Sequence, residues 1–360
     1  MRIGLLKLVD RMVGGIATAL LPAPVHETVA QPRRLLFIRP GGIGDAVLLI
    51  PVLLALKGKF PDAEISVLAE RRNASAFSFC AAVDHLLLYD RPAELARAVR
   101  GAYQVVIDTE QWYRLSAVVG RLTRAPMLIG FATNERKRLF THPVSYSQEQ
   151  YEALCFFRLV EPLGITPPSR IAVPFLELPA VALQAAEGLL ELLGARPFVT
   201  VFPGASAPQK QWGTDNFREL TRKLAARDIA VVIVGGGDTR LAARQIARGG
   251  PALDLTGRTT LAVTAALIAK GRVLVSGDSG LLHIAAGLGT PTVSLFGPSD
   301  LRKWGPKGES DLVFHAGLPC APCSRFGNIS PCAGAAGCLG GITVAQVFAA
   351  VETLLGREGA

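Results

Sequence analysis

The stretch that decides the fold is RLLFIRPGGIGD, residues 34–45. It contains the unbroken apolar run 35–38, which is typical of a buried parallel strand. The glycine-rich residues 40–44 predict a tight loop, and residues 46–56 carry apolar side chains at helical spacing. A strand, a glycine loop and a helix in this order predict an α/β fold with a parallel sheet.

The same unit recurs along the chain. Further apolar runs predict strands at residues 64–68, 105–108, 198–202, 229–234, 273–276 and 292–296, and helices at 181–193 and 214–226. Several of these strands end in glycine loops, and open α/β sheets bind ligands at such strand ends. We therefore expect two α/β halves with a ligand cleft between them. The expected segments are domains at 31–175 and 180–345, a proline-rich connection at 162–179 and a C-terminal helix at 343–360.

The composition fits a folded chain of two domains. Of its 360 residues, 50% are hydrophobic and 19% are charged, which excludes a mostly disordered protein. No run of eighteen apolar residues predicts a membrane-spanning helix. The formal net charge of +9 suits an anionic partner such as a nucleotide phosphate or an acidic lipid. Nucleic acid is not expected, because the basic residues are scattered and no stacking-aromatic motif accompanies them.

Residues 1–30 are expected to form a separate N-terminal segment. Its apolar residues recur at helical spacing and include Leu5, Leu6, Val9, Met12 and Val13. Charged residues interrupt this pattern, which argues against a secretory signal. Two interpretations stay open: an ordinary helix packed on the domain, or an amphipathic segment that lies on an anionic membrane surface.

Asp45 is the most informative residue of the first loop. An aspartate in a first helical turn usually complements the helix dipole, but beside a glycine loop it can act as a general base. Local chemistry alone favours the structural role. A dinucleotide-binding loop is the rival interpretation, although Gly41, Gly42 and Gly44 do not have the spacing G-x-G-x-x-G. Glu70, after the second strand, could serve as that loop's ribose-binding acid.

Two loops of the second half predict phosphate chemistry. The loop PGASAPQKQW, residues 203–212, places Ser206 and Lys210 before a helix. Lys210 could neutralise a phosphate, or it could be a solvated surface lysine. Trp212 is expected in the core.

The other loop is SGDSGLLH, residues 276–283. Asp278 or Ser279 can cap the helix that follows, and the free N–H groups there, beginning near Gly280, would hold a diphosphate. His283 either reaches the same spot or is a structural residue. A further helix entrance follows the glycines at 235–237, where Asp238 could accept a ribose hydroxyl.

Taken in order, these motifs resemble glycosyltransferase family 9, the bacterial ADP-heptose:lipopolysaccharide heptosyltransferases. The resemblance covers roughly residues 33–356, and its stretches are RPGGIGD (39–45), PGAS (203–206), KQW (210–212), DSGLLH (278–283), GTP (289–291), FGPSD (296–300) and WGP (304–306). It implies a GT-B fold: two Rossmann-like domains whose parallel sheets face a central cleft. The acceptor would bind the N-terminal half and the nucleotide-sugar the C-terminal half.

The resemblance also implies a reaction. A heptose would pass from ADP-L-glycero-D-manno-heptose to a lipid-linked core sugar, with inversion and without a cofactor. Such an enzyme would be cytoplasmic and peripheral on the inner face of the bacterial inner membrane. Residues 66–151 match no pattern closely, so the donor class is better supported than the acceptor.

The family's site residues carry over to positions already singled out. Asp45 matches the proposed general base, and Lys210 matches the lysine that stabilises the leaving diphosphate. The matching nucleotide-sugar positions are Ser206, Asp238, Asp278, Ser279, Gly280 and His283, and the acceptor-side loop contains Gly41, Gly42 and Gly44.

Four of the six cysteines lie in the loop at 318–340 with the spacing C-x2-C-x8-C-x5-C. They are Cys320, Cys323, Cys332 and Cys338. They could hold a structural zinc or iron, or they could be free thiols, since the later intervals differ from those of a common finger.

Other functions remain open. A protein of this fold could be a nucleotide-sugar epimerase or hydrolase, could use another sugar or glycan acceptor, or could bind the nucleotide-sugar without catalysis. A dinucleotide oxidoreductase is the least favoured alternative.

Overall fold

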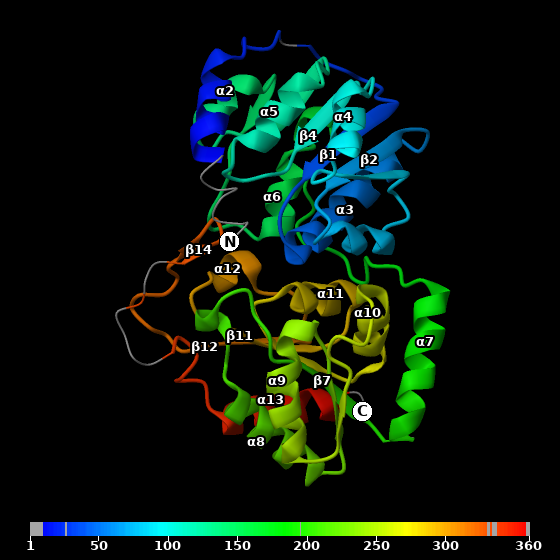
Figure 1. The fold of residues 1–360 in the computed structure, drawn as a ribbon, viewed down its shortest axis with the longest axis vertical. Coiled ribbons are helices and arrows are strands. Elements are labelled where there is room, and N and C mark those ends of the chain that lie inside the picture. The colour runs from blue at the N-terminus through cyan, green and yellow to red at the C-terminus, as the bar shows by residue number, and fades with distance from the viewer. Residues whose placement is uncertain (1–9, 26, 195, 330–331, 333–336, 358–360) are drawn as a thin grey trace. The chain divides into compact units, whose positions relative to one another are not determined.

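The computed structural model describes residues 10–25, 27–194, 196–329, 332 and 337–357. It divides into two compact units, Met1–Ile171 and Ala172–Ala360. Figure 1 traces the alternation of strands and helices in each unit. The boundary between them falls within the proline-rich residues 162–179.

Unit 1 contains one six-stranded parallel sheet in the order β3-β2-β1-β4-β5-β6. Its strands are β1 (Arg34–Arg39), β2 (Glu64–Ala69), β3 (His85–Leu88), β4 (Val105–Asp108), β5 (Met127–Phe131) and β6 (His142–Val144). Its α-helices are α2 (Gly15–Leu20), α3 (Ile43–Lys59), α4 (Pro92–Arg100), α5 (Leu115–Leu122) and α6 (Glu152–Arg158). Shorter helical turns are η1 (Asp10–Gly14), η2 (Ala74–Phe79), η3 (Glu135–Leu139) and η4 (Glu161–Leu163).

Unit 2 repeats this topology, with the parallel order β12-β11-β10-β7-β8-β9. Its sheet strands are β7 (Phe198–Phe202), β8 (Ala230–Ile233), β9 (Ala252–Asp254), β10 (Leu274–Gly277), β11 (Thr292–Phe296) and β12 (Asp311–His315). Its α-helices are α7 (Ala180–Leu190), α8 (Thr214–Ala225), α9 (Arg240–Ile246), α10 (Leu261–Lys270), α11 (Gly280–Leu288), α12 (Leu301–Trp304) and α13 (Val344–Arg357). The remaining elements are η5 (Glu191–Leu193), η6 (Pro208–Lys210), η7 (Gly237–Thr239), η8 (Ala247–Gly249) and the antiparallel pair β13 (Ser324–Arg325) and β14 (Asn328–Ile329).

The prediction of two α/β halves with parallel sheets is therefore confirmed. Counted from its own first strand, each sheet has the order 3-2-1-4-5-6, which is the order of dinucleotide-binding folds. The reason is visible in the strands: β1 and β4 of unit 1 are buried along almost their whole length, as unbroken apolar runs require when helices cover both faces.

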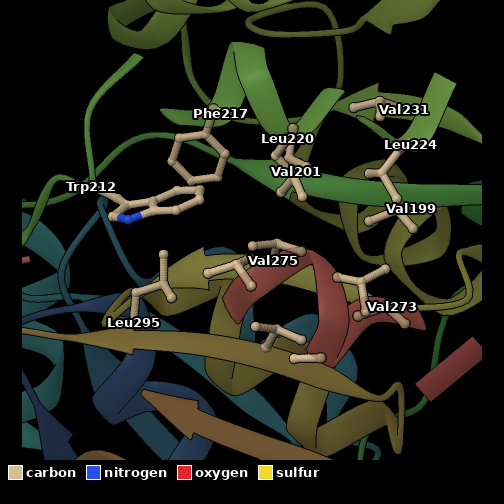
Figure 2. Close-up of a cluster of buried hydrophobic side chains, with 14 of the residues drawn as sticks. Val199, Val201, Trp212, Phe217, Leu220, Leu224, Val231, Val273, Val275 and Leu295 are labelled. Carbon is tan, nitrogen blue, oxygen red and sulfur yellow. The ribbon is translucent and has the colours of Figure 1, made fainter. Parts of the chain in front are cut away.

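The core of unit 2 confirms the interpretation of Trp212 as a core residue. Trp212 is 4% exposed and meets Phe217 edge-on, with 5.1 Å between ring centroids. Figure 2 shows these two rings beside the valines of β7 and β10. The indole N–H donates to the carbonyl of Ile342, 2.8 Å away, so the buried ring has its polar atom paired.

One helix start differs from the prediction. Helix α3 begins at Ile43, so Gly44 is helical and not part of the loop. Helix α8 begins at Thr214, as predicted, and its N-cap is Gly213. Gly213 has φ +101°, a left-handed conformation that favours glycine.

The N-terminal segment packs on unit 1 through one face. Asp10 accepts hydrogen bonds from the backbone N–H groups of Arg114 and Leu115 at 2.7 and 2.8 Å, where α5 begins. Ala17 and Leu21 pack against the core of unit 1. The interpretation as a packed helix is therefore correct for this face. In the described part of the chain, no helix combines the length and the apolar character needed to cross a bilayer.

Candidate functional site

Each unit gathers its candidate residues at the point where its strand order reverses. In unit 1 this point lies between β1 and β4, and in unit 2 it lies between β7 and β10. The loops that leave neighbouring strands there diverge to opposite faces of the sheet and open a crevice at the carboxyl ends of the strands. Asp45 follows β1, and Lys210 and Asp278 follow β7 and β10.

Glycines shape the loop before Asp45. Gly41 has φ +118°, and a Cβ there would lie 3.1 Å from Nη2 of Arg39. Gly42 is the N-cap of α3, and a Cβ on it would lie 3.3 Å from the Asp45 carboxylate. The loop can therefore fold closely over both charged groups. Asp45 lies in the first helical turn with 24% of its side chain exposed.

Arg39 is a buried cation directly beneath this loop. It is 1% exposed and donates to the carbonyl of Thr109 at 2.9 Å and to the carboxylate of Glu110 at 3.1 Å. Its Nη1 lies 3.9 Å from Oδ1 of Asp45. Burial opposes its charge, but the carboxylates of Asp45, Glu110 and Glu152 outweigh burial and raise the pKa of Arg39. The guanidinium is thus a permanent positive charge beside Asp45.

Gln111 is a functional candidate that the sequence analysis missed. Its side-chain Nε2 donates to Oδ1 of Asp45 at 3.1 Å and to Oε1 of Glu152 at 2.7 Å. Glu152 also accepts from the hydroxyl of Tyr146 at 3.0 Å, and burial and the nearby carboxylate raise the pKa of Tyr146. The amide therefore fixes the orientation of Asp45. One signal was present in the sequence: DTEQ, residues 108–111, is a polar run that begins at the last residue of a buried strand.

In unit 2, Lys210 and Asp278 form an ion pair across two strand ends. Nζ of Lys210 lies 2.5 Å from Oδ2 of Asp278, and the hydroxyl of Ser299 donates to the same oxygen at 2.5 Å. A Cβ on Gly277 would lie 2.8 Å from the carbonyl oxygen of Lys210, so glycine permits this close approach. Burial by itself opposes ionisation of Asp278, but the charges of Lys210 and His283 outweigh it and lower its pKa. The pair is therefore charged on both sides.

The neighbouring helix α11 begins with a capped end. Ser279 accepts a hydrogen bond from the N–H of Leu282 at 3.2 Å and lies 2.9 Å from the hydroxyl of Ser276. Ser279 is therefore the cap, and Asp278, the other candidate, serves the ion pair instead. Gly280 is the first helical residue. The N–H groups of such a first turn and the positive end of the helix dipole favour an anion.

His283 is a buried residue of α11. It is 2% exposed, and its ring centroid lies 6.3 Å from that of Trp304. Its charge contributes to the lowered pKa of Asp278. His283 therefore belongs to the same cluster as the ion pair. Ser299, which completes the cluster, was missed as a site residue although it lies in the quoted stretch FGPSD.

Ser206 and Asp238 lie in loops at the same edge of the sheet, but their side chains are more exposed than those of Lys210 and Asp278. Ser206 is exposed in the loop after β7, and Asp238 is exposed in η7, after β8. A Cβ on Gly257 would lie 2.9 Å from Cα of Gly237, so the loops after β8 and β9 are in contact there. Both residues stay predictions.

The cysteine tract contacts the loop that follows β11. A Cβ on Gly297 would lie 2.8 Å from that of Cys338 and 3.1 Å from the carbonyl of Gln209. Burial and the three other thiols, Cys320, Cys323 and Cys332, raise the pKa of Cys338. Within the described residues, however, no group of three or more His, Cys, Asp or Glu side chains is arranged to hold a metal ion. In this arrangement the four thiols do not fit the zinc or iron site considered above.

A family model matches a large part of the chain. The model of glycosyltransferase family 9 (heptosyltransferase) matches residues 93–333. Lipopolysaccharide heptosyltransferase 3 of Escherichia coli (strain K12) is 28% identical over 300 residues, which are 76% of this chain and 85% of that protein.

Solved structures show the same fold. The ADP-heptose lipopolysaccharide heptosyltransferase II of E. coli aligns with a TM-score of 0.75 at 23% identity, covering 91% of this chain and 100% of that one. An E. coli heptosyltransferase with ADP aligns with a TM-score of 0.69 at 20% identity, covering 90% and 98%. The chain therefore has the same fold as those enzymes.

Proposed function

The chain belongs to glycosyltransferase family 9 and is a glycosyltransferase, and from this premise we propose that it transfers a heptose from ADP-L-glycero-D-manno-heptose to a glycolipid. The acceptor would be a hydroxyl of the lipopolysaccharide core or a related glycolipid, and the anomeric carbon would invert. We further propose that the enzyme is cytoplasmic and bound peripherally at the membrane that contains this glycolipid.

The observation that carries the proposal is the Lys210–Asp278–Ser299 cluster beside the start of α11. A lysine next to open helical N–H groups suits the diphosphate of a nucleotide-sugar. As ADP departs, negative charge grows on the diphosphate. Lys210 and the N–H groups of the first turn, from Gly280 onward, would stabilise that charge. Asp278 and Ser299 hold the ammonium in place for this task.

The base would come from unit 1. An acceptor hydroxyl is a weak nucleophile, so Asp45 would accept its proton as the oxygen attacks the anomeric carbon. Gln111 and Arg39 hold the carboxylate, with one oxygen bonded to the amide. The bond to the acceptor oxygen forms as the bond to the diphosphate breaks, which inverts the anomeric carbon. The proposed chemistry needs no metal, because Asp45 takes the proton and Lys210 with the helix N-terminus stabilises the leaving group.

Ser206 and Asp238 are proposed to complete the nucleotide side. Ser206 lies in the Lys210 loop, and Asp238 is exposed where the loops after β8 and β9 meet. An exposed carboxylate at such a strand end can accept hydrogen bonds from ribose hydroxyl groups. Gly41, Gly42 and Gly44 would let the acceptor approach the backbone before Asp45.

The test is a donor titration followed by a transfer assay. The protein is titrated with ADP-heptose, GDP-sugars and UDP-sugars, and then incubated with the bound donor and truncated core glycolipids. We expect tight binding of ADP-heptose alone and formation of a heptosylated lipid with the inverted anomeric configuration. Release of free sugar without an acceptor would instead identify a hydrolase or an epimerase. Binding without any turnover would identify a non-catalytic member.

A further inference from the structure

The N-terminal helical segment carries an apolar stripe that faces solvent. The stripe consists of Met12, Val13, Ile16 and Leu20, whose exposed fractions are 60%, 53%, 61% and 79%. Residues 12, 16 and 20 are spaced four apart, so they lie along one side of the helical path through η1 and α2. A surface helix normally presents polar side chains on this side, so the stripe calls for a partner.

The opposite side of the segment is anchored, so the stripe cannot simply turn inward. Asp10 is 4% exposed and bonded to the N–H groups that begin α5, and Thr18 is fully buried. A Cβ on Gly14 would lie 3.0 Å from Cβ of Arg114, which shows how closely the backbone approaches the domain. Rotation of the helix would bury the stripe only by exposing Asp10 and Thr18 and breaking these contacts.

Basic side chains flank the stripe at its C-terminal end. Arg138 donates to the carbonyl of Ala19 at 2.9 Å, and Arg121 donates to the carbonyl of Pro22 at 3.2 Å. These are the carbonyls on either side of Leu20 and Leu21. Leu122, beside Arg121, is 46% exposed and adds apolar surface. Apolar side chains next to arginines suit a surface that offers both acyl chains and negative charge.

We propose that this stripe, Met12, Val13, Ile16 and Leu20, inserts into the headgroup region of an anionic lipid bilayer, with Arg121 and Arg138 at the lipid phosphates. The alternative occupant is a second copy of the chain. An isologous contact between copies would bring the same arginines together, and the resulting repulsion disfavours it. A bilayer surface of opposite charge has no such cost. The net charge of +9 acts in the same direction.

The inference goes beyond the proposed transfer reaction and uses none of its site residues. It deepens that proposal in one respect, because it gives unit 1 a defined contact with the surface in which a glycolipid acceptor would lie. The two can fail separately, since nucleotide binding and transfer to a lipid-free core oligosaccharide do not require a bilayer.

The test measures partition of the full chain onto vesicles. Wild-type protein, Ile16→Ser/Leu20→Ser and Arg121→Gln/Arg138→Gln are sedimented with vesicles of pure phosphatidylcholine or of phosphatidylcholine with phosphatidylglycerol. The matched control is Leu241→Ser, which removes from α9 in unit 2 a leucine whose exposure (72%) lies between those of Ile16 and Leu20. Thermal unfolding and ADP affinity confirm that each variant is folded.

We expect wild-type protein and the Leu241 control to bind the anionic vesicles. The Ile16→Ser/Leu20→Ser variant should partition roughly 100-fold less, because each large aliphatic side chain contributes about tenfold or more on leaving water. The arginine variant should lose about tenfold or more on anionic vesicles, since each basic residue near such a surface contributes about fivefold. Transfer to a lipid-free acceptor should not change.

Several results would overturn the proposal. One is the absence of wild-type binding to anionic vesicles, and another is equal binding by wild-type protein and the Ile16→Ser/Leu20→Ser variant. Equal losses in that variant and the Leu241 control would show that the stripe is not special. Light scattering tests for the alternative occupant. A dimeric wild-type protein together with a monomeric Ile16→Ser/Leu20→Ser variant would assign the stripe to a contact with a second copy of the chain.

Discussion

Asp45 and Lys210 each depend on a side chain far away along the chain. Asp45 is held by Gln111, 66 residues later, and Lys210 is paired with Asp278, 68 residues later. In both cases the partner follows a strand that neighbours the strand before the charged residue. The parallel sheet brings these loops together because the carboxyl ends of its strands share one edge.

Asp45→Asn should abolish measurable transfer and leave ADP affinity unchanged. The amide cannot accept the proton of the acceptor hydroxyl, and loss of such a base costs about 10²–10⁴-fold in rate. Steady-state transfer rates and ADP titration measure the two effects. Turnover near the wild-type rate would exclude Asp45 as the base.

Gln111→Leu should lower kcat less than Asp45→Asn, because the carboxylate is retained and only its orientation is lost. The matched control is Gln104→Leu, which removes an amide oxygen that accepts from the backbone N–H groups of Arg33 and Arg34 at the start of β1, the other end of that strand. The transfer rates of the two variants are compared at saturating donor and acceptor. A loss of kcat in the Gln104 variant equal to that in the Gln111 variant would contradict a positioning role for Gln111.

Lys210→Ala should lower kcat by about 10²–10³-fold, because the departing diphosphate loses a preorganised cation. It also leaves Asp278 without its main counter-charge, so the variant should be less stable. Transfer kinetics and urea unfolding measure the two changes. An unchanged turnover would remove Lys210 from the reaction.

The lowered pKa of Asp278 predicts how the free energy of unfolding changes in acid. In an unfolded chain an aspartate has a pKa near about 3.9, and Lys210 and His283 lower the pKa of Asp278 in the folded protein against the effect of burial. Its ionised form therefore stabilises the fold fully above pH ~4–5, and this stabilisation is lost as the pH falls through the lowered pKa. Urea unfolding should give a free-energy difference between wild type and Asp278→Asn that is present at about pH 5 and above and declines as the pH falls below about 4. A difference that already vanishes near pH 6 would contradict this assignment.

At the scale of elements, the decisive feature is the start of helix α11. The strand β10 ends at Gly277, and the helix begins at Gly280, so only two residues turn the chain. Ser279 caps the helix while Asp278 points into the ion pair. Of these two adjacent residues, Ser279 therefore stabilises the helix start and Asp278 pairs with the charge of Lys210.

Substitutions at Ser279 can separate the cap from the anion site. Ser279→Ala should cost about 1 kcal/mol in the free energy of unfolding, because the N–H of Leu282 loses its acceptor. Ser279→Asp keeps a capping oxygen and the stability, but should weaken ADP binding more than Ser279→Ala, because it adds a negative charge beside the diphosphate. Urea unfolding and ADP titration measure both quantities. Tighter ADP binding by Ser279→Asp would place the diphosphate elsewhere.

At the scale of the whole molecule, two units of the same topology carry different chemistry. In unit 1, the loops after β1 and β4 bring carboxylates and an amide together around a buried arginine. In unit 2, the loops after β7 and β10 bring together a lysine and a helix N-terminus. The shared strand order gives each unit a reversal point where ligands bind in such sheets, and the side chains at that point decide which ligand each unit suits.

ADP should protect the backbone amides of unit 2 from hydrogen exchange more than those of unit 1. Hydrogen exchange followed by mass spectrometry should show the largest protection in the segments 203–212 and 276–283, because the diphosphate would bond their backbone N–H groups. The segment 39–45 should change less, since in the proposed function it would serve the acceptor. Protection confined to 39–45 would reverse the assignment of donor and acceptor halves.

The sequence alone determined the architecture and singled out Asp45, Lys210 and Asp278 as candidate site residues. Unbroken apolar runs followed by glycine loops identify buried parallel strands and their ligand-binding ends, because both features follow from local residue types. The order of the motifs indicated the family, and the family model matches residues 93–333.

Only the tertiary structure decided which groups hold Asp45 and Lys210, which of Asp278 and Ser279 caps α11, and which face of the N-terminal segment is buried. Gln111, Glu152 and Ser299 have no local pattern that assigns them to a site; the pairing of strands brings them there. The physical reason is the same throughout. Hydrogen bonds and ion pairs between distant residues depend on which strands are neighbours, and no short stretch of sequence contains that information.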